Sequence, residues 1–301
     1  MRSSLVQWCV RQRRIIGSAL LGGLMLLGGC SALGFAYGRG PALGQWWLNR
    51  YADFDAGQVR LLRGGLDQWF DWHRREQLPD DLALLERAAH ELAADITPAQ
   101  ACGWWATFER KRDRDLLQMT PAVVELAATL TPEQLGQIQR RFDKTNADWR
   151  DENLQVTPRE RERAAVDRVI DRLESVYGRL DADQRLFVGE RVRRTVWDAQ
   201  RGYTERLARQ QDTLQTLQKL RTLAQSGGDP AARLAVAQAW VTRAFAPMDD
   251  SARAYRAQLL DDQCRFAADF HNRSNPAQRS RAAATLRGWA NELAGYVLPA
   301  P

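Results

Sequence analysis

Apolar residues recur at three- and four-residue spacing along most of the chain from residue 45 onward, and this spacing predicts amphipathic helices. No sustained run alternates Val, Ile, Thr or aromatic residues with polar ones, as a half-buried strand would require. The pattern therefore predicts an all-α fold, an elongated bundle of many helices. The helices are expected at 57–76, 80–95, 98–117, 121–129, 132–150, 158–178, 182–225, 230–244, 248–272 and 276–296.

The segment 182–225 is expected to be one unusually long helix. Val196, Tyr203 and Leu207 belong to a seam with three- and four-residue spacing. At 1.5 Å per residue, some 40 residues would reach roughly 60 Å. Such a seam needs long partner helices, and the helices expected at 158–178 and 248–272 are the predicted partners.

Six of the expected helices begin with the same signal, a Thr, Asp or Asn followed three residues later by Gln or Glu. The first side chain can accept a hydrogen bond from an unpaired N–H of the first turn, and the second can reach back to the N–H of the capping residue. Each copy therefore predicts a helix start. The copies are Asp55–Gln58, Thr97–Gln100, Thr131–Gln134, Thr157–Glu160, Asp181–Gln184 and, in a looser form, Asn275–Gln278.

The N-terminus has the layout of an export signal. Four arginines and no acidic residue precede Ile15–Leu27, a stretch of 13 uncharged residues, and small residues follow it. A transmembrane helix is the alternative, but crossing a ~30 Å hydrocarbon core takes about 20 apolar residues. Residues 1–29 are therefore expected to be a signal peptide.

The end of this segment, Leu27-Gly28-Gly29-Cys30, resembles the lipobox of bacterial lipoproteins. The resemblance implies that the chain is cut before Cys30 and that acyl chains such as palmitate anchor this residue in a membrane. Ser31 is not the aspartate that typically retains such proteins in the inner membrane. The resemblance thus favours the periplasmic face of the outer membrane, with the inner membrane as the alternative.

Domain organisation follows from this assignment. Residues 30–44 are rich in glycine and are expected to form the lipidated Cys30 and a flexible tether. Residues 45–301 are expected to form the helical domain, which is long enough for two sub-bundles. The stretch 150–157 is the candidate boundary between them.

Charge and motifs argue against several classes of function. Without the four arginines of residues 1–29 the formal charge falls from +6 to +2, so nucleic acid is not an expected partner. The three histidines lack metal-ligand spacing, and no nucleophile-elbow, phosphate-loop or dinucleotide motif is present. We expect no metal, no cofactor and no catalytic residue. His73, near Asp71 and Glu76, is interpreted as part of a charge cluster on a helix surface.

Cysteines and tryptophans supply the remaining candidates. Cys102 and Cys264 are the only pair left after export and lipidation, and in an oxidising compartment they are a candidate disulfide, with two separate buried thiols as the alternative. Tryptophans near the lipid end could rest in a membrane interface or line a groove for apolar segments of other proteins, with core packing as the alternative. This candidate surface comprises Trp46, Trp47, Trp69 and Trp72.

Two resemblances concern the helical domain. Leu130–Gln134 is similar to the Leu-Thr-x-x-Gln signature of the Spy/CpxP family, all-helical periplasmic proteins of which some are ATP-independent chaperones or stress modulators. Helix capping alone explains the same five residues. The runs Trp46–Asp55 and Trp69–Pro79, together with the lipobox, resemble a family of uncharacterised proteobacterial lipoproteins.

These features favour a lipid-anchored envelope protein that binds other envelope proteins without catalysis, as a chaperone-like factor would. One alternative is a helical enzyme acting on the cell wall or on lipid, which would need a carboxylate of raised pKa in a cleft. Another is a passive envelope scaffold. The expected partners are the membrane, through Cys30, and other envelope proteins.

Overall fold

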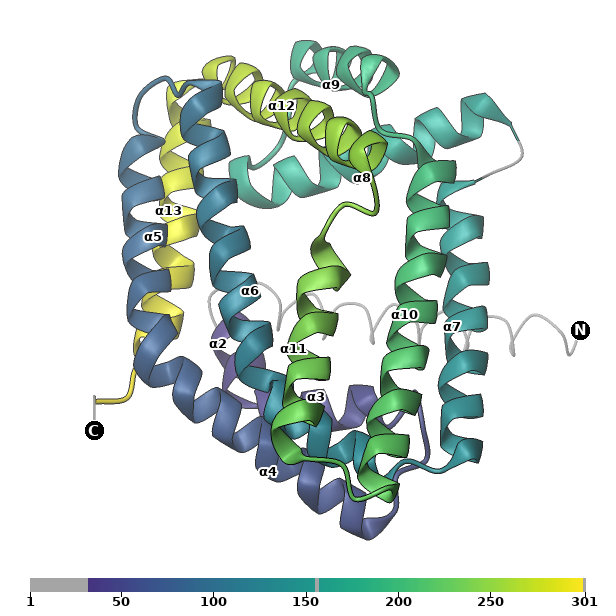
Figure 1. Cartoon of the computed structure of the whole chain (residues 1–301). Coiled ribbons are helices and arrows are strands. Elements are labelled where there is room, and N and C mark those ends of the chain that lie inside the picture. Colours follow the sequence, from purple (N-terminus) through teal and green to yellow (C-terminus); the bar gives the residue numbers. More distant parts are fainter. Residues whose placement is uncertain (1–31, 155–156, 300–301) are drawn as a thin grey trace, which may run out of the picture.

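The computed structural model describes residues 32–154 and 157–299, and within these ranges the chain forms helices and no strand (Figure 1). The predicted all-α fold is confirmed. The lipobox and Cys30 lie outside the described residues, and none of the described helices is apolar over a length that would cross a membrane. The helices are α2 (Ala32–Gly38), α3 (Gly40–Leu48), α4 (Ala56–Trp72), the π-helical turn η1 (His73–Gln77), α5 (Leu78–Glu91), α6 (Pro98–Thr129), α7 (Pro132–Asn153), α8 (Pro158–Tyr177), α9 (Ala182–Arg194), α10 (Ala199–Gln225), α11 (Pro230–Phe245), α12 (Asp250–Asn272) and α13 (Pro276–Ala294).

The helix α6 organises the arrangement. It spans 32 residues and packs against α4, α10, α11 and α12 (Figure 1). On one side of the molecule α13 lies along α5, and α2 packs on α13. On the other side α7 lies along α10, while α8 and α9 pack on α13 and α12. Helices far apart in the sequence therefore pack side by side, as α5 and α13 do.

Apolar burial in the described part is divided among three clusters rather than gathered in one core. One cluster includes Leu130, Ile138 and Leu220, where α6, α7 and α10 meet. The other two lie toward α8, α9, α12 and α13, and one of them contains Phe270. The first cluster takes residues from both sides of 150–157.

All six predicted capping boxes are present. Four of their glutamines also pair across helices. The amides of Gln58 and Gln134 exchange hydrogen bonds of 2.9 and 2.6 Å, and those of Gln184 and Gln278 exchange bonds of 2.7 and 2.9 Å. Each amide also donates to the carbonyl two residues before its partner's capping residue. The pairs thus join the start of α4 to that of α7, and the start of α9 to that of α13.

The prediction of one long helix over 182–225 is wrong, because the chain leaves the helix between Thr195 and Asp198. Contacts with α12 hold this break. The Thr195 hydroxyl donates to Asp262 at 3.2 Å, and the Asp198 N–H donates to the Tyr255 hydroxyl at 2.8 Å. Asp198 then caps the first turn of α10. Periodicity along the sequence carries no sign of these tertiary bonds.

The helices expected at 98–117 and 121–129 are instead one helix, α6, with Pro121 inside it. Proline has no N–H for the carbonyl four residues earlier, here that of Leu117. The Thr120 hydroxyl donates to this carbonyl at 2.6 Å. The carbonyl therefore keeps a donor, and the helix continues past the proline.

Two packed helices, α2 and α3, occupy residues expected to belong to the tether. A Cβ atom on Gly40 would lie 2.1 Å from the Phe70 ring, and one on Gly38 would lie 2.6 Å from the Tyr296 hydroxyl. The N–H of Gly34 also donates to the α13 residue Glu292 at 2.9 Å. Here the glycines permit close helix contacts, whereas the sequence pattern suggested flexibility.

Candidate functional site

A groove of about 840 Å³ lies between α6, α10, α11 and α12. Its apolar lining includes Trp105 and Leu117 of α6, Phe245 of α11 and Leu260 of α12. Trp105, Leu117 and Phe245 are 41%, 40% and 40% exposed. Apolar side chains that line a hollow and stay partly open to solvent are typical of binding sites.

Charged side chains border this apolar lining. Glu205 of α10 is mostly buried and pairs with Arg209 at 3.2 Å and with Arg256 at 3.4 Å. The guanidinium carbon of Arg112 lies 4.0 Å from the centre of the Phe245 ring. An apolar centre with a rim of both charges can accept apolar side chains while leaving hydrogen-bonding groups for a polar backbone.

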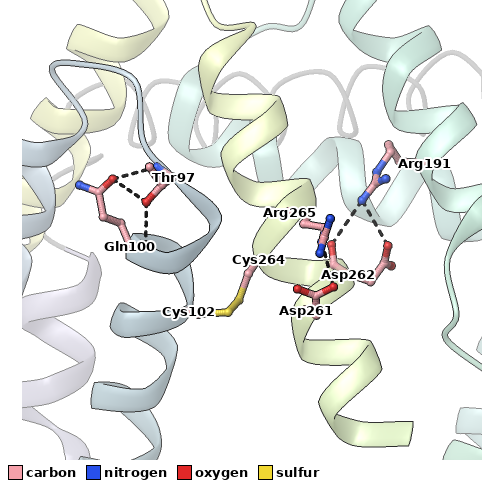
Figure 2. The surroundings of a disulfide bond; sticks show 8 residues. All are labelled: Thr97, Gln100, Cys102, Arg191, Asp261, Asp262, Cys264 and Arg265. Atoms are coloured by element: carbon pink, nitrogen blue, oxygen red, sulfur yellow. Dashed lines mark hydrogen bonds and ion pairs between the residues drawn. A yellow bond between two sulfur atoms is a disulfide. The ribbon is translucent and has the colours of Figure 1, made fainter.

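A disulfide ties two walls of the groove together (Figure 2). Cys102 of α6 and Cys264 of α12 are bonded, with their Cα atoms 5.4 Å apart. Each cysteine is about one helical turn from a lining residue, Trp105 or Leu260. Figure 2 also shows Arg191 reaching from α9 to Asp262 of α12, at 3.2 Å. The position of α12 beside the groove is therefore fixed by a covalent bond and by an ion pair.

A second group of polar residues surrounds the π-helical turn η1. The N–H of Leu78 bonds to the carbonyl of His73, one residue further back than in an α-helix, and Pro79 follows without an N–H to donate. His73 is only 8% exposed. Its Nδ1 lies 2.7 Å from the hydroxyl of Tyr37 on α2, and its Nε2 lies 3.5 Å from a carboxylate oxygen of Asp81 on α5. Hydroxyl, imidazole and carboxylate stand in the order found in catalytic triads.

Electrostatics oppose a nucleophilic Tyr37. Burial raises the pKa of Tyr37 to about 12, and burial lowers the pKa of His73. A neutral phenol and a neutral imidazole are thus favoured at neutral pH. The Tyr37 ring is also covered by the guanidinium of Arg74 and by the ring of Tyr296. The hydrogen bond between Tyr37 and His73 fastens α2 to the π-helical turn.

Asp115 of α6 lies close to this cluster. Burial raises the pKa of Asp115 to about 6, and the Asp81 carboxylate adds to the effect. Its backbone carbonyl accepts a hydrogen bond from the indole of Trp69 at 2.8 Å. Its buried Oδ1 atom has no hydrogen-bond partner in the described part of the chain. A half-buried carboxyl of this kind can hold a proton at mildly acidic pH.

A comparison with known protein families shows to which family the chain belongs. The sequence model of one family matches residues 50–227, more than half of the chain. The chain belongs to the DUF6279 family. This is a family of unknown function, and no curated protein and no solved structure matches the chain. The match covers η1, Asp115 and the groove walls α6 and α10, whereas α11 and α12 follow it.

The candidate tryptophans of this DUF6279 protein do not form one surface. Trp46 and Trp47 of α3 are 59% and 50% exposed. Trp69 and Trp72 are partly buried, and their rings lie 4.9 and 6.4 Å from the ring of His73. The structure thus separates an outward pair from a pair that packs around the π-helical turn.

The interpretation of His73 as part of a surface charge cluster is corrected. The side chain is buried and contacts Tyr37 and Asp81, rather than Asp71 and Glu76. Across residues 32–154 and 157–299, no group of three or more His, Cys, Asp or Glu side chains could hold a metal ion.

The groove was missed at the level of sequence because four helices contribute to it. One local sign existed, the adjacent Trp104 and Trp105, since neighbouring residues of a helix cannot both face the same core. Trp104 faces inward and its indole donates to Glu91 at 2.8 Å, whereas Trp105 lines the groove.

Proposed function

We propose that this DUF6279 protein is a lipid-anchored bacterial envelope protein that binds segments of other envelope proteins in the groove. The anchor is Cys30, and the proposed location is the periplasmic face of the outer membrane. The groove is the observation that carries the proposal, because it combines open aromatic side chains with a rim of both charges. Its size is in the range of small-ligand pockets, so it would hold a few side chains of an extended segment rather than a folded partner.

Two features support a protein-binding role over a passive scaffold. The groove is braced by the disulfide, so its walls do not need to assemble when a partner binds. The fold is also all-α, as the resemblance to Spy/CpxP proteins at Leu130–Gln134 implies. We therefore propose a chaperone-like factor that holds unfolded or extended segments.

Photo-crosslinking in cells tests the proposal. A photoreactive phenylalanine analogue in place of Phe245 should crosslink to envelope proteins, whereas the same analogue in place of Leu186 should not. Leu186 of α9 is not among the groove residues and, at 66% exposed against 40% for Phe245, is the more accessible of the two, so a lack of crosslinking there cannot come from burial. The purified protein should also suppress aggregation of a thermally unfolded client, and Phe245→Asp should lose this effect while Leu186→Asp keeps it. Equal crosslinking at both positions, or equal suppression by both variants, would refute the proposal.

A second candidate, an enzyme acting on the cell wall or on lipid, has Asp115 in its favour. A carboxyl of pKa about 6 could act as a general acid. Release of soluble products from peptidoglycan or phospholipid, falling above about pH 6 and lost in Asp115→Asn, is the expected result for that function. Product release that Asp115→Asn leaves unchanged would exclude this residue as the acid.

A further inference from the structure

The first two described helices present an apolar, cationic surface to solvent. On α3, Leu43, Trp46 and Trp47 are 45%, 59% and 50% exposed and lie on one face at three- and four-residue spacing. Phe35 of α2 is 63% exposed. These four residues are called the α2–α3 surface below.

Close contacts of the glycines in α3 account for the position of these helices, and Leu43 and Trp47 lie one turn from these glycines on the edge of the same face. Gly40 and Gly44 of α3 face Phe70 and Leu66 of α4, at distances that leave no room for a larger side chain at Gly40. The helices are therefore held by their glycines, while Leu43 and Trp46 stay exposed to solvent. Trp47 also packs on the ring of Tyr51, with the ring centres 4.8 Å apart, but half of its surface stays exposed, and Trp46 points away from the glycine contact.

Charge along this part of the chain is one-sided. Residues 1–52 contain no aspartate or glutamate, and the first acidic residue of the chain is Asp53. The charged residues of the two helices and the following turn are Arg39 and Arg50, and their guanidinium groups lie over the rings of Phe35 and Trp46. Apart from the Glu292 carboxylate of α13, which accepts from the N–H of Gly34, these are aromatic rings beside arginines, and such a surface matches a bilayer interface with anionic headgroups.

The position of Cys30 in the chain indicates what covers the α2–α3 surface. Cys30 is two residues before Ala32, so covalent geometry keeps their Cα atoms within about 8 Å. If Cys30 carries the lipid, as proposed above, α2 begins at the membrane surface. We infer that the α2–α3 surface lies in the headgroup region of the anchoring bilayer, where Trp46 and Trp47 insert their indoles. This inference rests on the proposed lipid anchor and fixes the orientation of the domain on the membrane.

Depth-dependent quenching of tryptophan fluorescence tests the inference on the full-length mature lipoprotein. The protein is reconstituted in vesicles of phosphatidylethanolamine and phosphatidylglycerol, with bromine atoms on the acyl chains near the headgroups. Trp46 and Trp47 are two of the ten tryptophans left once Trp8 is removed, so at most about one fifth of the emission should be lost. Trp46→Phe/Trp47→Phe should abolish this quenching. The matched control Trp105→Phe removes an exposed indole from α6 and should leave it unchanged.

Mass spectrometry of the peptide Cys30–Arg39 from the same sample separates the two proposals. An unmodified Cys30 would overturn both the anchor and this inference. An acylated Cys30 without quenching, or with quenching that survives Trp46→Phe/Trp47→Phe, would overturn the inference alone. Intermolecular disulfide formation by a Trp46→Cys variant in vesicles, with no quenching in the wild type, would assign the surface to a second copy of the chain instead.

Discussion

Replacing a paired glutamine should cost far more stability than replacing one that only caps. The perturbation is Gln58→Ala. The Gln58 side chain is 2% exposed and makes four hydrogen bonds, to the N–H of Asp55, to the carbonyl of Thr129 and two to the amide of Gln134. Gln100→Ala is the matched control, because Gln100 belongs to an exposed box and bonds only to Thr97.

The magnitude follows from these contacts. A buried hydrogen bond contributes about 1 kcal/mol, and a buried group left without a partner costs about 1–3 kcal/mol. Gln58→Ala removes four bonds but leaves Gln134 its bonds to Asp53 and Thr131, so we expect a loss of about 3–4 kcal/mol. Gln100→Ala should lose about 0.5–1 kcal/mol, as expected for a solvent-exposed cap.

Urea unfolding followed by circular dichroism at the helical band measures both values. A double-mutant cycle of Gln58→Ala with Gln134→Ala should give a coupling free energy of about 1 kcal/mol or more, because the two side chains are in direct contact. Equal losses for Gln58→Ala and Gln100→Ala, or no coupling in the cycle, would show that the glutamines act only as caps and that the paired geometry contributes nothing.

Three further predictions concern the disulfide, the acidic cluster and the proline. Replacing Cys102 and Cys264 with serine should lower the free energy of unfolding by up to about 5 kcal/mol in the chain-entropy model, since the bond closes a 162-residue separation; unchanged urea unfolding would contradict this. Folding raises the pKa of Asp115 from 3.8 to about 6 and so favours its protonated form, which means that wild-type stability should fall from about pH 4 to pH 6 relative to Asp115→Asn. Between pH 4 and pH 7 the wild type should lose about 1.5 kcal/mol relative to the variant, half of the full value for a pKa raised from 3.8 to about 6 because the group is half-buried, and parallel pH profiles would refute the assignment. Thr120→Val removes the donor to the Leu117 carbonyl and should cost about 1–2 kcal/mol by thermal unfolding, whereas no loss would show that this hydroxyl does not support the proline.

Helix starts could be predicted from sequence because capping is local. A Thr or Asp and the Gln three residues later interact within one turn, so the six boxes carry their own signal. The partner of each glutamine could not be predicted, because Gln58 and Gln134 are 76 residues apart. The capping motif thus predicted where each helix begins but not which other helix its glutamine contacts.

The predictions that were wrong concern features that depend on contacts between residues far apart in the sequence. The break at Thr195 depends on Asp262, which lies in the third helix after the break, and the helical pattern around it is otherwise continuous. Glycines such as Gly40 have two uses, flexibility and close packing, and composition alone does not separate them. The groove was unpredictable for a similar reason, since Trp105 and Phe245 meet only in the folded chain.

The helix α4 relates the two proposed surfaces to each other. Its Phe70 faces Gly40 of α3, and its Gly65 lies so near Ala122 of α6 that an added Cβ would be 2.5 Å from the Ala122 Cβ. The α2–α3 surface and the α6 wall of the groove are therefore linked through one helix with tight contacts on both sides. A flexible tether after Cys30 would let the domain rotate freely above the bilayer. Packed helices at that position would instead hold the groove at a set height and orientation, so that it meets segments of proteins at the same membrane.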